Sequence, residues 1–346
     1  MLSPPAWLCC IRYPMPANLS PEYKRAEQAY RLARQPREQL ECLKEMLRAI
    51  PKHKGTEHLQ ADIKSRIRGL TQESASHGKS AHRGSSHALH PDGAAQLCLI
   101  GPPGAGKSSL HASLTGSHRE VGPYPHPARL PIPGMLPFED IAFQLVDLPP
   151  VSFEFMQPEL TNLLRSTDGA LLVVDLSAPD CTEQLALILQ RLAVAKIILT
   201  ERWPATAELA PADPFSVYLP TLLLANKIDL ANPEDAAVLE DLLGVRFPVI
   251  ATSATCGRGL AEIGPFLFRA LGIVRVYTKA PGKPIDQNRP FTMRRGDTVL
   301  DVALRVHPDI ARTFKFARIW GSGKFNGQHV GADHPVADTD VVELHA

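Results

Sequence analysis

Short apolar runs alternate with longer segments of helical periodicity through the middle of the chain. Continuous apolar runs separated by helices are typical of parallel strands that are buried on both faces. The pattern therefore predicts an α/β domain over residues 96–272, with helices on both faces of a mostly parallel sheet. A Pro-rich stretch, residues 201–220, interrupts the pattern and is predicted to be a surface loop. The predicted strands lie at residues 97–100, 143–146, 170–174, 222–224 and 247–250.

The segment before this domain has a helical pattern. Leu40, Leu43 and Leu47 recur at helical spacing, and Ser20-Pro21 supplies an N-cap followed by proline at the first helical position. Prolines divide residues 20–70 into two or three short helices, so a small helical module is predicted. Its polar positions carry more Lys and Arg than Asp and Glu. Such an excess is typical either of a solvated face or of a surface for RNA or an acidic partner.

Three further stretches complete the organisation. Residues 1–19 show no organised pattern and are predicted to be a disordered extension, and the Ser, Gly and His-rich residues 71–95 are predicted to be a flexible linker. Residues 275–346 differ, because a helix is predicted over 298–306 and strand-like runs lie near 316–320 and 341–344. One helix with several strands predicts a small α+β domain at the end of the chain.

Composition narrows the possible partners. The chain has 346 residues and a formal net charge of +1, which argues against binding nucleic acid through bulk charge, so no DNA partner is predicted. The sequence has no run of 18 apolar residues, so no membrane partner is expected. The six cysteines form no C-x-x-C pair, which argues against a zinc site and favours a reducing compartment.

A phosphate-binding motif follows the first apolar run. Residues 101–108 fit G-x-x-x-x-G-K-[ST] and precede a helical segment, which is the context that the motif requires. Backbone N–H groups would close around a phosphate chain, Lys107 would reach the β- and γ-phosphates, and the Ser108 hydroxyl would bind Mg²⁺. Asp147, at the end of an apolar strand, would hold the same ion through water. The predicted phosphate-binding residues are Gly101, Gly104, Ala105, Gly106, Lys107, Ser108 and Ser109, with Lys107, Ser108 and Asp147 predicted to be catalytic.

A second motif indicates the base. Asn226-Lys227-Ile-Asp229 follows another apolar strand, and the Asp229 carboxylate can accept two parallel N–H bonds from the edge of guanine, which adenine does not offer. The Lys227 stem can lie across the base, and Ser253-Ala254 follows a later strand, where a backbone N–H can donate to the guanine oxygen. The order and spacing of these motifs predict a GTP- or GDP-binding site. An ATP-dependent kinase would require Asn226 and Asp229 to be coincidental.

Taken together, the motifs resemble the Obg and developmentally regulated GTP-binding (DRG) family. Tyr124 to Gly134 is similar to the stretch leading to I-P-G in that family. Lys54-Gly-Thr-Glu-His58, followed by a basic helix, resembles part of the family's N-terminal helical module. Residues 275–346, with Arg294 to Val302 and Phe316 to Gly321, resemble a TGS domain, a β-grasp module. The resemblance implies a cytoplasmic guanine-nucleotide protein that associates with ribosomes or RNA. The basic and aromatic residues expected to serve it are Arg275, Lys279, Lys283, Arg294, Arg295, Arg312, Lys315, Arg318 and Lys324, with Phe314 and Trp320 nearby.

The chain departs from the family at both contacts with the γ-phosphate. Pro127-Ala128 replaces paired threonines, and Asp147-Leu-Pro-Pro150 replaces D-x-x-G, so Pro150 has no N–H to donate. Val151 follows, where some GTPases carry a water-orienting Gln, and Gly104 replaces the Asn of potassium-activated relatives. Two alternatives remain open: a slow Mg²⁺-dependent GTPase, or a scaffold or RNA adaptor that holds nucleotide without hydrolysing it.

Overall fold

The computed structural model divides the chain into two compact units. One contains the chain up to Ala88 together with Leu209–Ser216, and the other contains Leu89–Glu208 with Val217–Ala346. The expected extension 1–19, the departures at Pro127-Ala128 and Val151, and part of the expected linker lie outside the described residues. The structure describes residues 20–32, 36–50, 56–79, 89, 91–117, 131–150, 158–203, 215–231, 247–283, 290–323 and 325–346.

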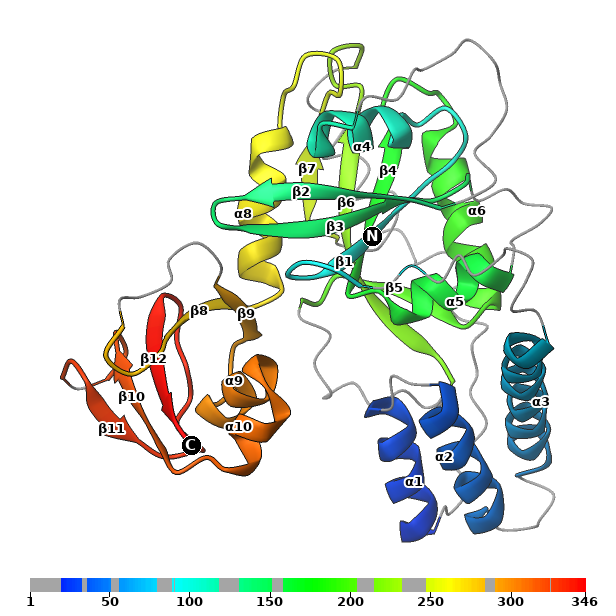
Figure 1. Cartoon of the computed structure of the whole chain (residues 1–346). Helices are drawn as coiled ribbons and strands as arrows, with labels where there is room; N and C mark the ends of the chain where they lie inside the picture. Colours follow the sequence, from blue (N-terminus) through cyan, green and yellow to red (C-terminus); the bar gives the residue numbers. More distant parts are fainter. Residues whose placement is uncertain are drawn as a thin grey trace, which may run out of the picture. The chain divides into compact units, whose positions relative to one another are not determined.

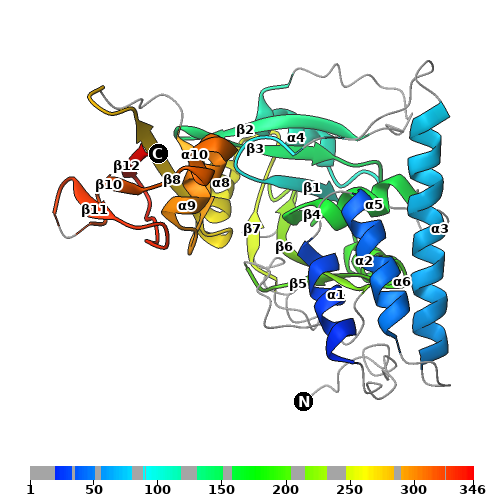
Figure 2. The same cartoon turned by 60° about the horizontal axis from the view of Figure 1, so that its bottom comes forward.

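The first unit is built on three helices that lie side by side (Figures 1 and 2): α1 (Pro21–Leu32), α2 (Pro36–Ala49) and α3 (Glu57–Lys79). The Ser20 hydroxyl caps α1 by accepting a hydrogen bond from the Tyr23 N–H at 3.1 Å. Helix α3 runs nine residues past the expected boundary at 70, so residues 71–79 are helical and not linker. Once a helix has nucleated, each further residue adds a hydrogen bond at small cost, which outweighs the weak helix propensity of Ser and Gly.

Phe215 belongs to the core of this helical unit. It is 1% exposed and is buried with side chains from all three helices, including Tyr23, Leu43 and Ile63. The Arg66 guanidinium lies 4.5 Å from the centre of its ring and also donates to the Phe215 carbonyl at 3.3 Å. Residues 201–220 were expected to form a surface loop, which is wrong for Phe215 and for Val217–Pro220, because β6 begins at Val217.

A seven-stranded sheet forms the centre of the second unit, in the order β2-β3-β1-β4-β6-β5, with β7 also paired to β6 (Figure 1). All neighbours are parallel except β2 and β3, which form an antiparallel hairpin. The five predicted strands are present, while β2 and β5 add two that the hydrophobic pattern did not predict. The strands are β1 (Gln96–Ile100), β2 (Ile132–Phe138), β3 (Ile141–Asp147), β4 (Gly169–Asp175), β5 (Ile197–Thr200), β6 (Val217–Asn226) and β7 (Val249–Ala251).

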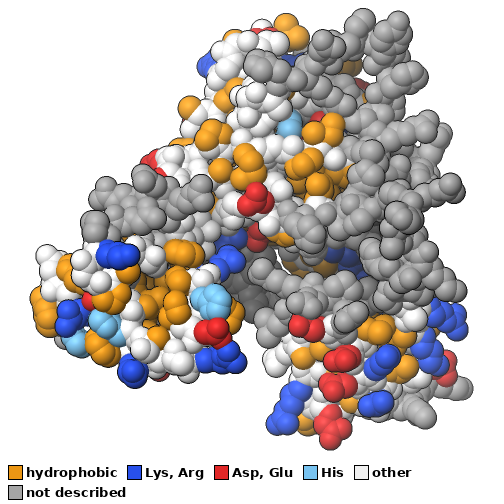
Figure 3. Space-filling model, in the orientation of Figure 1, with side chains coloured by type: hydrophobic (Ala, Val, Ile, Leu, Met, Phe, Trp, Pro, Cys, Tyr) orange, Lys and Arg blue, Asp and Glu red, His pale blue; other side chains and the backbone are white. Residues whose placement is uncertain are grey.

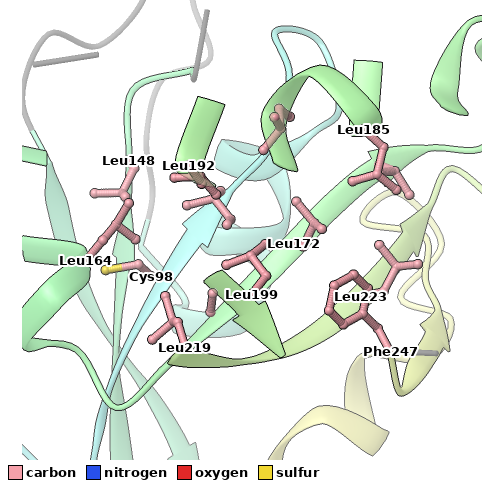
Figure 4. Close-up of a cluster of buried hydrophobic side chains, with 14 of the residues drawn as sticks. Cys98, Leu148, Leu164, Leu172, Leu185, Leu192, Leu199, Leu219, Leu223 and Phe247 are labelled. Carbon is pink, nitrogen blue, oxygen red and sulfur yellow. The ribbon is translucent and has the colours of Figure 1, made fainter. Parts of the chain in front are cut away.

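Helices cover both faces of this sheet. Helices α5 (Pro158–Ser166) and α6 (Cys181–Val194) pack Leu164 and Leu185 on one face, against Cys98 and other strand residues (Figure 4). On the opposite face, α4 (Lys107–Thr115) and α8 (Leu260–Ala270) contribute to a second cluster. Because side chains alternate along a strand, the two clusters share the same strands. The predicted α/β architecture is confirmed.

A five-stranded sheet in the order β11-β10-β12-β8-β9 forms the C-terminal domain. Helix α9 (Val299–Val306) begins at the predicted place, because Thr298 and Asp301 form a capping box, and it buries Val302 in the domain core. The short α10 (Pro308–Arg312) follows. The strands are β8 (Ile273–Lys279), β9 (Phe291–Arg294), β10 (Phe316–Trp320), β11 (Gln328–Val330) and β12 (Asp340–His345).

Arg275 on β8 joins this domain to the tip of the β2–β3 hairpin. Its guanidinium donates to Asp140 at 3.0 Å and to Glu139, and it forms a second, two-point contact with Asp338 at 2.7 and 3.0 Å. The Tyr277 hydroxyl also donates to Asp140. Hydrogen bonds that Arg275 donates to Asp338, the largest cause, and to Asp140 hold the pKa of Arg275 above its usual value, although burial opposes the shift. The C-terminal domain is therefore tied to one end of the hairpin whose other end carries Asp147.

Candidate functional site

The predicted site residues meet at the carboxyl edge of the large sheet. The segment Gly101–Gly106 follows β1, Asp147 ends β3, and Asn226 ends β6. Pairing places Leu99 of β1 opposite Asp147, and Asp175 of β4 opposite Asn226. In parallel sheets this edge is where ligands bind, because the connecting loops open there.

The phosphate-binding loop excludes a side chain at one glycine and disfavours it at another. Gly106 has a φ of 89°, and a Cβ there would lie 2.3 Å from the Asn226 amide nitrogen. Gly104 has a φ of 77°, a left-handed conformation that side chains disfavour. These conformations let the loop turn directly into α4, whose first turn carries Ser108 and the exposed Ser109.

Lys107 is held inside the loop. Its ammonium donates to the carbonyl oxygens of Gly101 and Pro102 at 3.0 and 2.8 Å, and the residue is 6% exposed. Burial lowers the pKa of Lys107 to about 8, although the nearby Asp147 carboxylate opposes the shift. The loop thus contains a poorly solvated positive charge without a salt-bridge partner among the described residues, which favours the approach of an anion.

Ser108 and Asp147 form a pair of oxygen donors. The Ser108 hydroxyl donates to Asp147 Oδ2 at 2.6 Å. The other carboxylate oxygen, Oδ1, is buried and has no hydrogen-bond partner among the residues that the structure describes. A buried carboxylate oxygen without a partner is costly, and a hydroxyl beside a carboxylate is a donor set suited to a hard divalent cation. These two residues therefore fit Mg²⁺.

Asn226 links the phosphate-binding loop to the second motif. Its amide donates to the Ala105 carbonyl at 2.8 Å, and its side-chain oxygen accepts a hydrogen bond from Thr252 at 3.4 Å. Both ends of this buried side chain are thus used within the protein. Nucleotide binding by Asn226 stays a prediction, and the structure adds that this side chain holds two loops together.

Asp229 remains exposed to solvent at the end of this motif. Its Oδ2 accepts a hydrogen bond from the Thr255 hydroxyl at 3.2 Å. A hydrogen bond from Ser253 is the main cause that holds the pKa of Asp229 below its usual value, so the group is a carboxylate at neutral pH. The Ser253 backbone N–H donates to the Arg258 carbonyl at 3.0 Å, which shapes the turn that carries Ala254. An ionised, accessible carboxylate is the acceptor that the guanine edge needs.

Two residues near the site were not predicted from the sequence. Asp175, at the end of β4, forms an ion pair with Lys227 at 2.6 Å, and Thr255 contacts Asp229. A signal for Asp175 was present, since it ends an apolar run in the same way as Asp147. Its partner lies 52 positions further along the chain, so only the strand register identifies the pair.

Known families match two parts of the chain. Residues 96–202 match the family described as 50S ribosome-binding GTPase, and residues 274–346 match the TGS domain. A GTP-binding protein of Methanocaldococcus jannaschii is 28% identical over 89% of this chain and 92% of its own length. Developmentally-regulated G-protein 2 of Arabidopsis thaliana is 26% identical over 85% of this chain and 87% of its own. The chain thus resembles the developmentally-regulated GTP-binding (DRG) proteins over most of its length, and it contains a GTPase domain and a TGS domain.

A mouse protein matches a similar share of the chain, whereas a solved structure matches about half of it. Mouse developmentally-regulated GTP-binding protein 2 is 24% identical over 85% of this chain and 94% of its own length. The solved FeoB fragment of S. thermophilus is 25% identical over 51% of this chain and 63% of that chain, with a TM-score of 0.37. The expected resemblance is confirmed, as are the GTPase and TGS domains and the guanine nucleotide as ligand class.

Proposed function

We propose that the DRG-like protein binds GDP and GTP together with Mg²⁺ and hydrolyses GTP slowly. One observation carries the proposal. The Asn226 amide donates to the Ala105 carbonyl at 2.8 Å and thereby holds the base-recognition segment, residues 226–229, on the phosphate-binding loop. The two motifs thus form one site. Asp229 would accept the guanine N–H groups, and the loop would surround the phosphates.

Each residue of the site has a distinct task in this proposal. Lys107 would exchange its carbonyl partners for phosphate oxygens, and nucleotide binding would raise its pKa because the ammonium gains an anionic partner. Ser108 and Asp147 would hold Mg²⁺, which supplies charge neutralisation at the β- and γ-phosphates. The Ser108–Asp147 hydrogen bond would open to admit the ion. The helix that begins at Lys107 adds positive potential at its N-terminus.

The third phosphate has fewer contacts in this proposal. Pro150 lies three residues after Asp147, where the family has a glycine, and it has no N–H. Losing one preorganised donor typically lowers a rate by about 10²–10³. Because Pro150 offers no N–H to the γ-phosphate, we expect slow hydrolysis of GTP and similar affinities for GDP and GTP.

Titration of the full chain with GDP, a non-hydrolysable GTP analogue and ATP in magnesium buffer tests this proposal. We expect both guanine nucleotides to bind with similar affinity, ATP to bind far more weakly, and GTP to release phosphate at a low rate that Asp147→Asn abolishes. Equal affinities with no release would favour the alternative, a nucleotide-bound scaffold or RNA adaptor. Absence of guanine-nucleotide binding would refute both.

We also propose that the protein acts with ribosomes or RNA through its TGS domain and the basic face of its helical unit. On the TGS sheet, the Phe316 ring is stacked between His329 and His345, at 4.6 and 4.4 Å between ring centres. Lys279 lies 4.1 Å from the centre of the Trp320 ring. Basic and histidine side chains are interspersed with apolar ones on this domain (Figure 3), a mixture suited to unpaired RNA bases.

Among the basic residues expected on that surface, Arg275 and Arg294 contact the GTPase domain instead. Arg275 is 13% exposed within its acidic cluster, and Arg294 donates to Asp168 at 3.0 Å and to the Leu271 carbonyl at 3.1 Å. The RNA test therefore uses Arg318→Glu, which changes a half-exposed side chain on the open sheet. We expect this variant to co-sediment less with ribosomes at low salt and to bind GDP normally. Unchanged sedimentation would contradict a role for this surface.

A cytoplasmic location completes the proposal. The described cysteines Cys42, Cys98, Cys181 and Cys256 are all free, which is consistent with a reducing compartment. Among the described helices, none combines the length and the apolar character needed to span a bilayer. Fractionation of cells that express the tagged full chain tests the location.

A further inference from the structure

Asp175 lies beside the base-recognition segment without belonging to any predicted motif. It ends β4, and the register of the sheet places it opposite Asn226, the residue before Lys227. One carboxylate oxygen, Oδ2, accepts the Lys227 ammonium at 2.6 Å. The other, Oδ1, accepts two hydrogen bonds from Ser177, from its backbone N–H at 2.9 Å and from its hydroxyl at 2.6 Å. The carboxylate is therefore fixed from both sides.

The backbone at Lys227 is also fixed in an unusual conformation. Its φ is 63°, a left-handed value that non-glycine residues rarely adopt. Two hydrogen bonds hold the turn around it: the Leu230 N–H donates to the Lys227 carbonyl at 2.8 Å, and the Leu176 N–H donates to the Asn226 carbonyl at 3.0 Å. The backbone turn fixes the position of the Lys227 Cα, and Asp175 fixes the position of its ammonium. The methylene stem between them therefore has little freedom left.

We infer that Asp175 is a positioning residue of the nucleotide site, which holds Lys227 so that its methylene stem forms a wall against one face of the guanine ring. The inference rests on the proposed function. A free lysine loses much rotational entropy when it packs on a ligand, and an ion pair formed in advance removes that cost. The carboxylate itself touches no part of the nucleotide in this role.

The environment of the pair distinguishes it from an ordinary surface ion pair. The side chains of Asp175 and Lys227 are 15% and 33% exposed, whereas fully solvated pairs contribute little. Burial alone would raise the pKa of Asp175, but the hydrogen bonds from Lys227 and Ser177 outweigh it and hold the pKa below its usual value. The pair is therefore intact throughout the neutral range.

A double-mutant cycle with Asp175→Asn and Lys227→Ala tests the inference, with release of fluorescent GDP from the full chain in magnesium buffer as the measurement. We expect Asp175→Asn to accelerate release about tenfold and the double variant to release no faster than Lys227→Ala alone, because Asp175 acts through Lys227. Inosine diphosphate, which lacks the amino group that Asp229 recognises, should show the same acceleration. Asp180→Asn is the control, since Asp180 bonds Gln184 of its own helix, and we expect unchanged release.

Two outcomes would overturn the inference while leaving the proposed function intact: an unchanged release rate in Asp175→Asn, or effects that multiply in the double variant. Ser177→Ala provides a second test if Asp175→Asn fails to fold, because it removes the hydroxyl hydrogen bond to the carboxylate and leaves the backbone one, and we expect about a threefold acceleration. An unchanged rate in this variant would count against the inference. If the wild-type chain retained no guanine nucleotide, the proposed function and the inference would both fail.

Discussion

Replacing Lys107 with methionine is expected to stabilise the nucleotide-free protein while abolishing nucleotide binding. Burial lowers the pKa of Lys107 from 10.5 to about 8. At about 1.4 kcal/mol per unit, the charged form is disfavoured in the folded protein by about 3 kcal/mol at pH 7. Methionine removes this penalty but loses the hydrogen bonds to Gly101 and Pro102, of about 1 kcal/mol each. The net gain is about 1 kcal/mol in the free energy of unfolding.

The pH dependence of this gain has a definite sign. Between pH 8 and 10.5 the unfolded chain still binds a proton that folded Lys107 has released. Wild-type stability therefore rises with pH across this window, and the advantage of the methionine variant shrinks. Below pH 8 both states are protonated and the advantage is constant.

Urea unfolding of nucleotide-free protein measures the effect, with Trp203 fluorescence as the signal for the GTPase domain in a Trp7→Phe, Trp320→Phe background. Lys283→Met, at an exposed lysine, is the control and should change nothing. Added GDP should stabilise the wild type but not Lys107→Met. A methionine variant less stable than the wild type at pH 7 would refute the reasoning, since the hydrogen bonds would then outweigh desolvation.

Three other substitutions test separate parts of the molecule. Asp229→Asn should transfer the preference from guanine to xanthine nucleotides, because an amide can donate to the xanthine oxygen; a retained guanine preference in competition binding would contradict the role of Asp229. Pro150→Gly restores an N–H and should raise the affinity ratio of GTP analogue to GDP about 10- to 100-fold in calorimetry, whereas Pro149→Gly should leave it unchanged. Phe215→Ala should destabilise the helical unit by about 3–5 kcal/mol, read as lost hydrogen-exchange protection in α1–α3, while Phe325→Ala, 65% exposed, should cost nothing measurable.

The site motifs could be predicted from sequence because each is local: a strand, a loop and the start of a helix lie within a dozen residues. Features that depend on distant partners could not. Phe215 is buried by helices from the first 80 residues of the chain, and its Pro-rich surroundings indicate a loop. Strand β2 contains Pro133, Gly134 and Pro137, which disfavour a strand, yet β2 is at the edge of the sheet, where proline is tolerated. The pairing of Asp175 with Lys227 likewise requires the strand register.

The β2–β3 hairpin connects the TGS domain to the proposed cation site. Strand β3 ends at Asp147, and its other end lies about 20 Å away at the usual rise per residue. That end follows the turn that contains Asp140, to which Arg275 of the TGS domain donates a hydrogen bond. A displacement of the TGS domain would therefore act on the same strand that carries the proposed cation site. Arg275→Ala should therefore alter Mg²⁺-dependent GDP release from a distance. Arg294→Ala severs the separate tie to Asp168 and should leave that rate as it was.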